Sequence, residues 1–140
     1  PPATAGRREI DIRRWGPAMW DVLYATAFAY PDDPTPAEQA AARDFFHSLQ
    51  LILPCTHCRD HFAAFLRRRP VATGSSADLT AWVLALNNDV NGRTGKPAVS
   101  LEAVWQGLQD HRHRRRCSAL LVWVVGLAIL FVCLLARCLW

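Results

Sequence analysis

The sequence lacks the cysteines that would make a disulfide-held scaffold. It has five cysteines in 140 residues, and only Cys55 and Cys58 lie close together. No other cysteine precedes Cys117, which excludes the small secreted proteins that many disulfides hold together. The sequence also begins Pro1-Pro2 without an initiator methionine. The lack of an N-terminal targeting segment therefore carries no weight.

No run of useful length alternates apolar and polar residues with the period of a β-strand, and no internal repeat is present. Apolar residues instead recur at helical spacing, which predicts an all-α protein, and the length allows one domain. A turn at 15–17 is expected to start the first helix, after a disordered segment 1–14. Thr35 and Glu38 predict a capping box for the second helix, and Ser76 is the expected cap of the fourth. The expected helices cover residues 17–30, 36–53, 55–69, 76–91 and, as a short fifth, 100–108.

A long apolar run follows the predicted domain. Residues 117–136 carry no charge, and at helical rise they span about 30 Å, the thickness of a bilayer core. Residues 111–116 are a basic juxtamembrane block, and only a short tail, 137–140, follows the run. The block has no interleaved aromatic residues, which favours anionic lipid headgroups over nucleic acid. We expect a single-pass, tail-anchored protein whose domain faces the cytosol.

The cysteine pair has three interpretations. Two buried structural cysteines are one, although polar Thr56 and His57 lie between them. Half of a zinc site is another, but structural zinc usually needs a second Cys/His pair. A redox-active disulfide is the third, because two thiols at i and i+3 on a first helical turn can close a small ring. The helix N-terminus also stabilises a thiolate that is exposed there.

The flanking segments suggest an electron acceptor for such a pair. Aromatic residues lie in the first predicted helix, and asparagines end the fourth. Together they could sandwich and hydrogen-bond a planar heterocycle such as a flavin. Taken alone this pattern is weak, because buried aromatic residues more often belong to a core.

Four ordered motifs add a resemblance. They are Trp20-x-x-Leu23-Tyr24, Tyr30-Pro31, Pro54-Cys55-x-x-Cys58 and Asn87-Asn88-x-Val90-Asn91 with Gly95-Lys96. In this order the chain resembles the FAD-dependent sulfhydryl oxidases of the Erv/ALR family, over about residues 15–108. Trp15-Gly16-Pro17 and the sequence around the cysteines look most like the short oxidases of large cytoplasmic DNA viruses.

The resemblance implies a four-helix bundle around FAD, crossed by a short fifth helix, within residues 15–110. It implies that Cys55 exchanges with a client thiol and that Cys58 delivers electrons to the flavin. Oxygen would then take the electrons and give hydrogen peroxide. No metal is expected. The residues that the resemblance places around FAD are Gly16, Trp20, Tyr24, Tyr30, His61, Asn87, Asn88, Asn91, Lys96 and Trp105.

The chain departs from the family pattern at several points. The family usually has histidine where Tyr24 and Asn87 stand, so altered FAD contacts are expected. The second, structural disulfide of cellular members has no cysteines here. Cys117 and Cys138 lie at opposite ends of the apolar run, so we expect no intramolecular shuttle. Protein clients, such as a small thioredoxin-like carrier, would meet Cys55 directly. Family members commonly pair through their first two helices, which predicts a homodimer with Trp15, Phe45 or Phe46 as candidates for the interface.

The sequence is therefore interpreted as a membrane-anchored, FAD-dependent thiol oxidase that forms disulfides in proteins. Two alternatives stay open. One is a non-enzymatic membrane adaptor with a structural or zinc-binding cysteine pair. The other keeps the oxidase but places its domain in the lumen of the endoplasmic reticulum.

Overall fold

The structure, a computed structural model, describes residues 8–110. Over this part the chain is helical, and none of its residues lies in a strand. No helix within 8–110 is both long and apolar enough to cross a bilayer. The basic block 111–116, the expected membrane span 117–136 and the tail 137–140 lie outside the described residues. The fold of the described part confirms the all-α prediction.

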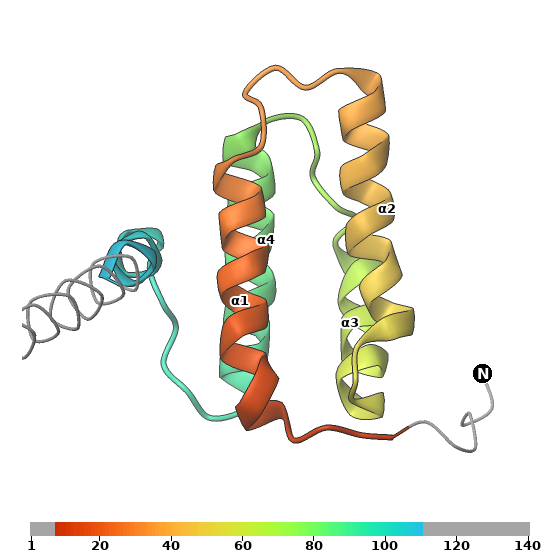
Figure 1. The fold of residues 1–140 in the computed structure, drawn as a ribbon, viewed down its shortest axis with the longest axis vertical. Coiled ribbons are helices and arrows are strands. Elements are labelled where there is room, and N and C mark those ends of the chain that lie inside the picture. The colour runs from red at the N-terminus through yellow and green to blue at the C-terminus, as the bar shows by residue number, and fades with distance from the viewer. Residues whose placement is uncertain (1–7, 111–140) are drawn as a thin grey trace, which may run out of the picture. The chain divides into compact units, whose positions relative to one another are not determined.

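Four helices form the first of two compact units, which ends at Ser100. They are α1 (Ile12–Phe28), α2 (Pro36–Ile52), α3 (Thr56–Arg68) and α4 (Ser76–Arg93). α1 packs mainly against α4, and α2 against α3 (Figure 1). Residues 101–110 are also helical and belong to the second unit, which begins at Leu101.

α1 begins earlier than the sequence predicted. The expected turn at 15–17 lies inside the helix, with Pro17 within it. Asp11 caps the helix by accepting a hydrogen bond from the backbone N–H of Arg13 at 3.0 Å. A side-chain cap satisfies one of the free N–H groups of a helix start. The disordered segment expected at 1–14 is thus wrong from residue 9 onward, because Glu9 and Ile10 are hydrogen-bonded to the start of α3 and Asp11 supplies a helix start upstream of the proline.

The remaining helix starts follow local capping rules. Thr35 and Glu38 form the predicted capping box, with Glu38 N–H donating to the Thr35 hydroxyl and the Glu38 carboxylate accepting from Thr35. α4 is capped by Ser75 and not by Ser76, which corrects the prediction. The Ser76 hydroxyl donates instead to the carbonyl of Ala27 at 3.1 Å, and so ties the start of α4 to α1.

Trp82 of α4 is the centre of the core. Its ring meets Phe46, Phe62 and Phe65 edge to face, with centroids 5.1, 6.3 and 5.5 Å away. Its indole N–H donates to the carbonyl of Arg69. The cluster joins α4 to both α2 and α3. Phe46 is fully buried there, so it cannot serve the dimer interface for which it was a candidate, whereas its neighbour Phe45 is exposed.

Candidate functional site

A disulfide joins Cys55 and Cys58 at the start of α3. The two Cα atoms are 5.2 Å apart. Cys55 is the N-cap residue, and its sulfur accepts a hydrogen bond from the backbone N–H of Cys58 at 3.2 Å. Both cysteines are half-buried. A sulfur at this position is close to the positive end of the helix dipole, which favours a thiolate when the bond opens.

Arg59 braces the turn that carries the disulfide. Its guanidinium donates to the carbonyl of Leu53 and to the hydroxyl of Thr56. These bonds hold the segment on each side of Cys55 to the first turn of α3. The sulfur pair therefore sits on a turn whose backbone is fixed from both sides.

A cavity of about 170 Å³ lies next to the disulfide. An apolar cavity of about 150 Å³ can hold a benzene ring, so this one is large enough for a ring of that size. Cys58 lines it, and Cys55 is not among its lining residues. All four helices contribute to its wall, which also includes aromatic Trp15 and Trp20. The disulfide thus has one of its two cysteines in the wall of the cavity.

Two histidines of α3 lie on the same wall. The rings of His57 and His61 meet with their centroids 3.7 Å apart, and both line the cavity. Burial lowers the pKa of His61, and the charges of Arg93 and His57 lower it further. His61 is therefore mostly neutral near pH 7, when its imidazole can accept a proton.

A charged pair on α4 completes the lining. One carboxylate oxygen of Asp89 accepts from Arg68 at 2.9 Å, and the other lies 3.5 Å from Nε of Arg93. That second oxygen is buried and has no hydrogen-bond donor among the described residues. Both Asp89 and Arg93 line the cavity. A buried acceptor with spare capacity favours a ligand that carries N–H or O–H donors.

The structure brings four of the predicted site residues to the cavity: Gly16, Trp20, Cys58 and His61. Gly16 is buried, and a Cβ there would come within 3.2 Å of Ile12 Cγ1. The glycine thus lets α1 keep a close contact with its own preceding turn. Trp20 presents the aromatic surface that the sequence predicted.

Tyr24 and Asn87 are buried but are not among the lining residues. The Asn87 side-chain amide donates to the Tyr24 hydroxyl at 3.1 Å and so joins α4 to α1. Burial raises the pKa of Tyr24, which keeps its hydroxyl protonated. Through the Tyr24 ring, whose centroid is 6.4 Å from that of Trp20, the pair contacts one wall residue of the cavity.

Asn88, Asn91 and Lys96 shape the end of α4 and do not line the cavity. Asn88 exchanges two hydrogen bonds with the backbone of Val99, at 3.0 and 2.8 Å. The Lys96 N–H donates to the carbonyl of Asn91 at 2.8 Å, across a turn in which Gly95 has a φ of 70°. This positive φ is one that glycine adopts readily.

Tyr30 and Trp105 are not brought to the cavity either. Tyr30 follows the far end of α1, about 20 Å from Gly16 at helical rise, and its hydroxyl donates to the carbonyl of Thr73. There it joins two loops at the opposite end of the bundle. Trp105 belongs to the second compact unit.

The sequence of the bundle matches a known family. The Erv1/Alr family matches this chain over residues 17–110. The chain belongs to the Erv1/Alr family. The match covers the disulfide and most of the cavity lining, so these features are part of a family domain.

Named relatives of this Erv1/Alr chain include a plant protein and viral proteins. It is 34% identical over 89 residues to "FAD-linked sulfhydryl oxidase ERV1" of Oryza sativa subsp. japonica, covering 64% of this chain and 46% of that protein. It is also 34% identical over 86 residues to the "FAD-linked sulfhydryl oxidase" of African swine fever virus, covering 61% of this chain and 72% of the viral protein. The chain thus spans less than half of the rice protein and most of the viral one.

The fold agrees with this membership. The yeast Erv1 core superposes with a TM-score of 0.67 at 24% identity, covering 78% of this chain and 95% of that chain. The FAD binding domain of Erv1 from Saccharomyces cerevisiae superposes equally well, with a TM-score of 0.67. At this identity the likeness concerns the fold.

Several lining residues of the Erv1/Alr domain were not predicted from the sequence as cofactor residues. The polar and aromatic ones are Trp15, His57, Phe62, Asp89, Arg93 and Thr94. Helical spacing could have found some of them, because Asp89 and Arg93 lie one turn apart beside the apolar Leu86 and Val90. Trp15 was missed because the sequence placed it in a turn before α1.

Proposed function

We propose that this chain is an FAD-linked sulfhydryl oxidase that forms disulfides in proteins. One observation carries the proposal: of the Cys55–Cys58 disulfide in this Erv1/Alr domain, Cys58 lines an aromatic-lined cavity and Cys55 does not. A disulfide with one cysteine in the cavity wall and the other outside the lining can exchange with a client through the outer cysteine and pass electrons inward through the other. The names of the relatives support the same activity.

The cavity fits an isoalloxazine ring by its chemistry. Trp15 and Trp20 supply aromatic surface, and the spare acceptor of Asp89 suits the N–H and O–H donors of a flavin. The residues that would hold the group are these three with Gly16, His61 and Arg93. When bound, FAD supplies a two-electron acceptor that dioxygen can reoxidise to give hydrogen peroxide.

Cys55 is the proposed site of client exchange. A client thiolate attacks the sulfur of Cys55, a client–Cys55 disulfide forms, and Cys58 leaves as a thiolate. A second client thiolate then attacks the client sulfur of that bond, and Cys55 leaves as a thiolate. The client has lost two electrons and the cysteine pair has gained them. The N–H of Cys58, which contacts the Cys55 sulfur, stabilises the departing thiolate of Cys55.

The histidines of α3 would handle protons when the pair returns to the disulfide. Once the two thiolates have taken up protons from water, that step removes two electrons and two protons from Cys55 and Cys58. His57 and His61 share the cavity wall with Cys58. His61, whose pKa is lowered mainly by burial, is available as a proton acceptor on the side where Cys58 lies.

The partners follow from this activity. Protein thiols are the substrates, with a small thioredoxin-like carrier as the candidate client and oxygen as the final acceptor. Exposed apolar side chains on α1 and α2, among them Val22, Phe45, Leu51 and Ile52, supply surface for a homodimer.

We also propose that residues 117–136 span a membrane with the domain on the cytosolic side. This proposal rests on their uncharged sequence and on the basic block before them. Glycosylation-tag mapping of the two flanks tests that orientation.

The activity is tested on the purified protein in mild detergent. We expect a flavin absorbance spectrum and oxygen uptake with dithiothreitol, both of which the zinc-adaptor alternative lacks. Cys58→Ala should keep the spectrum and lose the uptake. The control, Cys117→Ser with Cys138→Ser, should keep both, because no shuttle is proposed. A colourless protein without uptake would overturn the proposal, and a large loss of turnover on a dithiol protein in the control would overturn the direct route to Cys55.

A further inference from the structure

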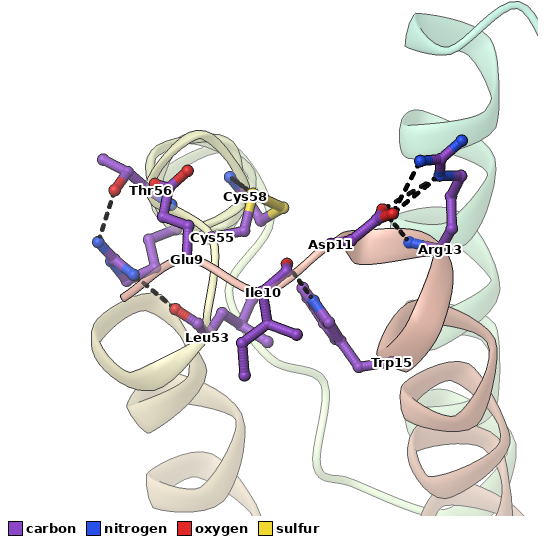
Figure 2. Close-up of a disulfide and its surroundings, with 10 residues drawn as sticks. Glu9, Ile10, Asp11, Arg13, Trp15, Leu53, Cys55, Thr56 and Cys58 are labelled. Atoms are coloured by element: carbon purple, nitrogen blue, oxygen red, sulfur yellow. Dashed lines mark hydrogen bonds and ion pairs between the residues drawn. A yellow bond between two sulfur atoms is a disulfide. The ribbon is translucent and has the colours of Figure 1, made fainter. Parts of the chain in front are cut away.

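A short segment before α1 crosses to the disulfide turn. Residues 9–11, which we call the strap, run between the start of α1 and the start of α3 (Figure 2). The N–H of Ile10 donates to the carbonyl of Pro54 at 3.1 Å. The carboxylate of Glu9 accepts from the N–H of Thr56 at 2.9 Å. The strap thus contacts the residues on either side of Cys55.

The strap is also anchored at its other end. Asp11 caps α1, and the indole N–H of Trp15 donates to the carbonyl of Ile10 at 3.0 Å. Glu9 is therefore held by bonds on both sides and is not a freely rotating surface residue. The strap lies before residues 17–110, the part of the chain that the family match covers.

Glu9 and Cys55 occupy the same helix terminus. Thr56 is the first residue of α3, and its N–H serves the Glu9 carboxylate. The N–H of Cys58, two residues on, serves the sulfur of Cys55. Hydrogen bonds with Thr56 lower the pKa of Glu9, so its carboxylate is charged at neutral pH. A negative charge there offsets part of the helix dipole and repels a thiolate nearby.

The other charged groups on the elements beside Cys55, within residues 8–110, are of both signs, and exposed Arg8 directly precedes Glu9. Arg59 of α3 lies beside Thr56 and favours the thiolate. Asp11 is paired with Arg13 at 2.8 Å, which cancels most of its field. His57 turns its ring to His61, and Asp60 follows on the exposed side of α3. The end of α2 contributes only Leu51, Ile52 and Leu53. Glu9 is thus the carboxylate bonded directly to the helix start that Cys55 caps.

We propose that Glu9 is a positioning residue that disfavours the thiolate of Cys55 and so sets the redox balance of the Cys55/Cys58 pair. Its charge makes the reduced pair less stable, which favours return to the disulfide and makes the disulfide a weaker oxidant of clients. The role of the pair rests on the proposed function, whereas the effect of Glu9 on its thiols can be measured without flavin or oxygen.

The test compares Glu9→Gln and Glu9→Ala with wild type. The glutamine removes the charge and keeps an acceptor for Thr56, and the alanine removes both. Asp44→Asn is the matched control, because Asp44 is an exposed carboxylate on α2, about 12 Å before the end of that helix at helical rise. Iodoacetamide labelling of the reduced protein across pH, read from the fragment ions of the peptide that carries both cysteines, reports Cys55 separately from Cys58. Equilibration with reduced and oxidised glutathione reports the balance between dithiol and disulfide.

We expect Glu9→Gln to label Cys55 about threefold faster at neutral pH and to move the labelling midpoint to lower pH. The glutathione equilibrium should move about threefold toward the dithiol, with two glutathiones oxidised per pair reduced. High salt should reduce the difference between Glu9→Gln and wild type in both measurements. Asp44→Asn should match wild type. Glu9→Ala should move in the same direction as Glu9→Gln.

Two results would overturn the proposal. One is an unchanged labelling profile and glutathione equilibrium in both Glu9→Gln and Glu9→Ala. The other is a change in Glu9→Ala alone, which would mean that the strap acts by covering Cys55. If Glu9→Gln shows the expected shifts in a protein without oxygen uptake, the proposal about Glu9 stands and the proposed oxidase fails.

Discussion

Tyr24 and Asn87 are the two positions at which the sequence departs from the histidines that the resemblance led us to expect. In the structure they contact each other, with the Asn87 amide donating to the Tyr24 hydroxyl. The two departures therefore form one buried polar pair between α1 and α4. A buried pair of this kind lowers the stability of the fold little when both partners are present. Removing one partner lowers it much more, because the other is left buried without a hydrogen bond.

Tyr24→Phe should lower the free energy of unfolding by about 1–3 kcal/mol, because the Asn87 amide is left buried without its acceptor. Asn87→Leu alone should cost a similar amount, since the hydroxyl then lacks its donor. The double variant should cost less than the sum of the two single changes, which urea unfolding can measure as a coupling energy. Strictly additive losses of stability would contradict the interaction between Tyr24 and Asn87.

His61 should titrate below the ordinary midpoint of histidine, which NMR of the imidazole can follow. Burial is the main cause and the charge of Arg93 the next, so Arg93→Gln should raise the pKa of His61, while Arg14→Gln on the exposed part of α1 should not. The unfolded chain binds the proton more readily, so this histidine lowers the stability of the fold as pH falls from about 6.5. A midpoint above 6.5 in wild type would contradict this electrostatic account.

At the scale of elements, the ends of helices carry most of the contacts that the sequence left undecided. Asp11 starts α1, Cys55 starts α3, and the segment after α4 returns to it through Asn88. Asn88 was predicted as a cofactor residue, but both ends of its amide are used by the backbone of Val99. The role of Asn88 is therefore to hold the segment 95–100 against the end of α4.

Asn88→Ala should therefore loosen residues 95–100 and leave the lining residues of the four helices in place. We expect faster amide hydrogen exchange at Val99 and a loss of about 1–2 kcal/mol of stability, because two hydrogen bonds disappear. Asn88→Asp is the matched control, since it keeps the acceptor for the Val99 N–H. Unchanged exchange at Val99 in Asn88→Ala would show that the segment is held by other contacts.

At the scale of the whole molecule, the cavity depends on all four helices at once. Its wall takes residues from α1, α2, α3 and α4, and the Trp82 cluster joins the α2–α3 half to α4. A ligand that binds this cavity binds only the assembled bundle. Its binding free energy therefore adds to the stability of the fold.

FAD added to flavin-free protein should raise the temperature at which the protein unfolds. At a free FAD concentration 100 times its dissociation constant, the gain in the free energy of unfolding should be about 2.7 kcal/mol. Trp20→Ala removes an aromatic wall and should reduce this gain. Tyr30→Phe should keep the gain, because Tyr30 lies at the opposite end of α1. Calorimetry with and without FAD measures both. If Tyr30→Phe lost the stabilisation by FAD, Tyr30 would have to be counted among the cofactor-binding residues after all.

The sequence by itself determined the helices and the redox pair. Helical periodicity, the Thr35–Glu38 capping box and the spacing of Cys55 and Cys58 are local signals, since the groups that interact lie within four residues of one another. The helix starts followed from these signals with two exceptions: Asp11 caps α1 upstream of the predicted turn, and Ser75, not Ser76, caps α4. The motifs that carried the family resemblance were equally local in sequence.

The tertiary structure alone decided which residues meet at the cavity. Of the predicted cofactor residues, Gly16, Trp20 and His61 line it, whereas Asn88 and Tyr30 bond to loops. Whether a side chain faces a cavity depends on the rotation of each helix against its neighbours, and packing between residues far apart in the chain sets that rotation. The same holds for Glu9, whose contact with Thr56 joins residues 47 positions apart and has no signature in the sequence.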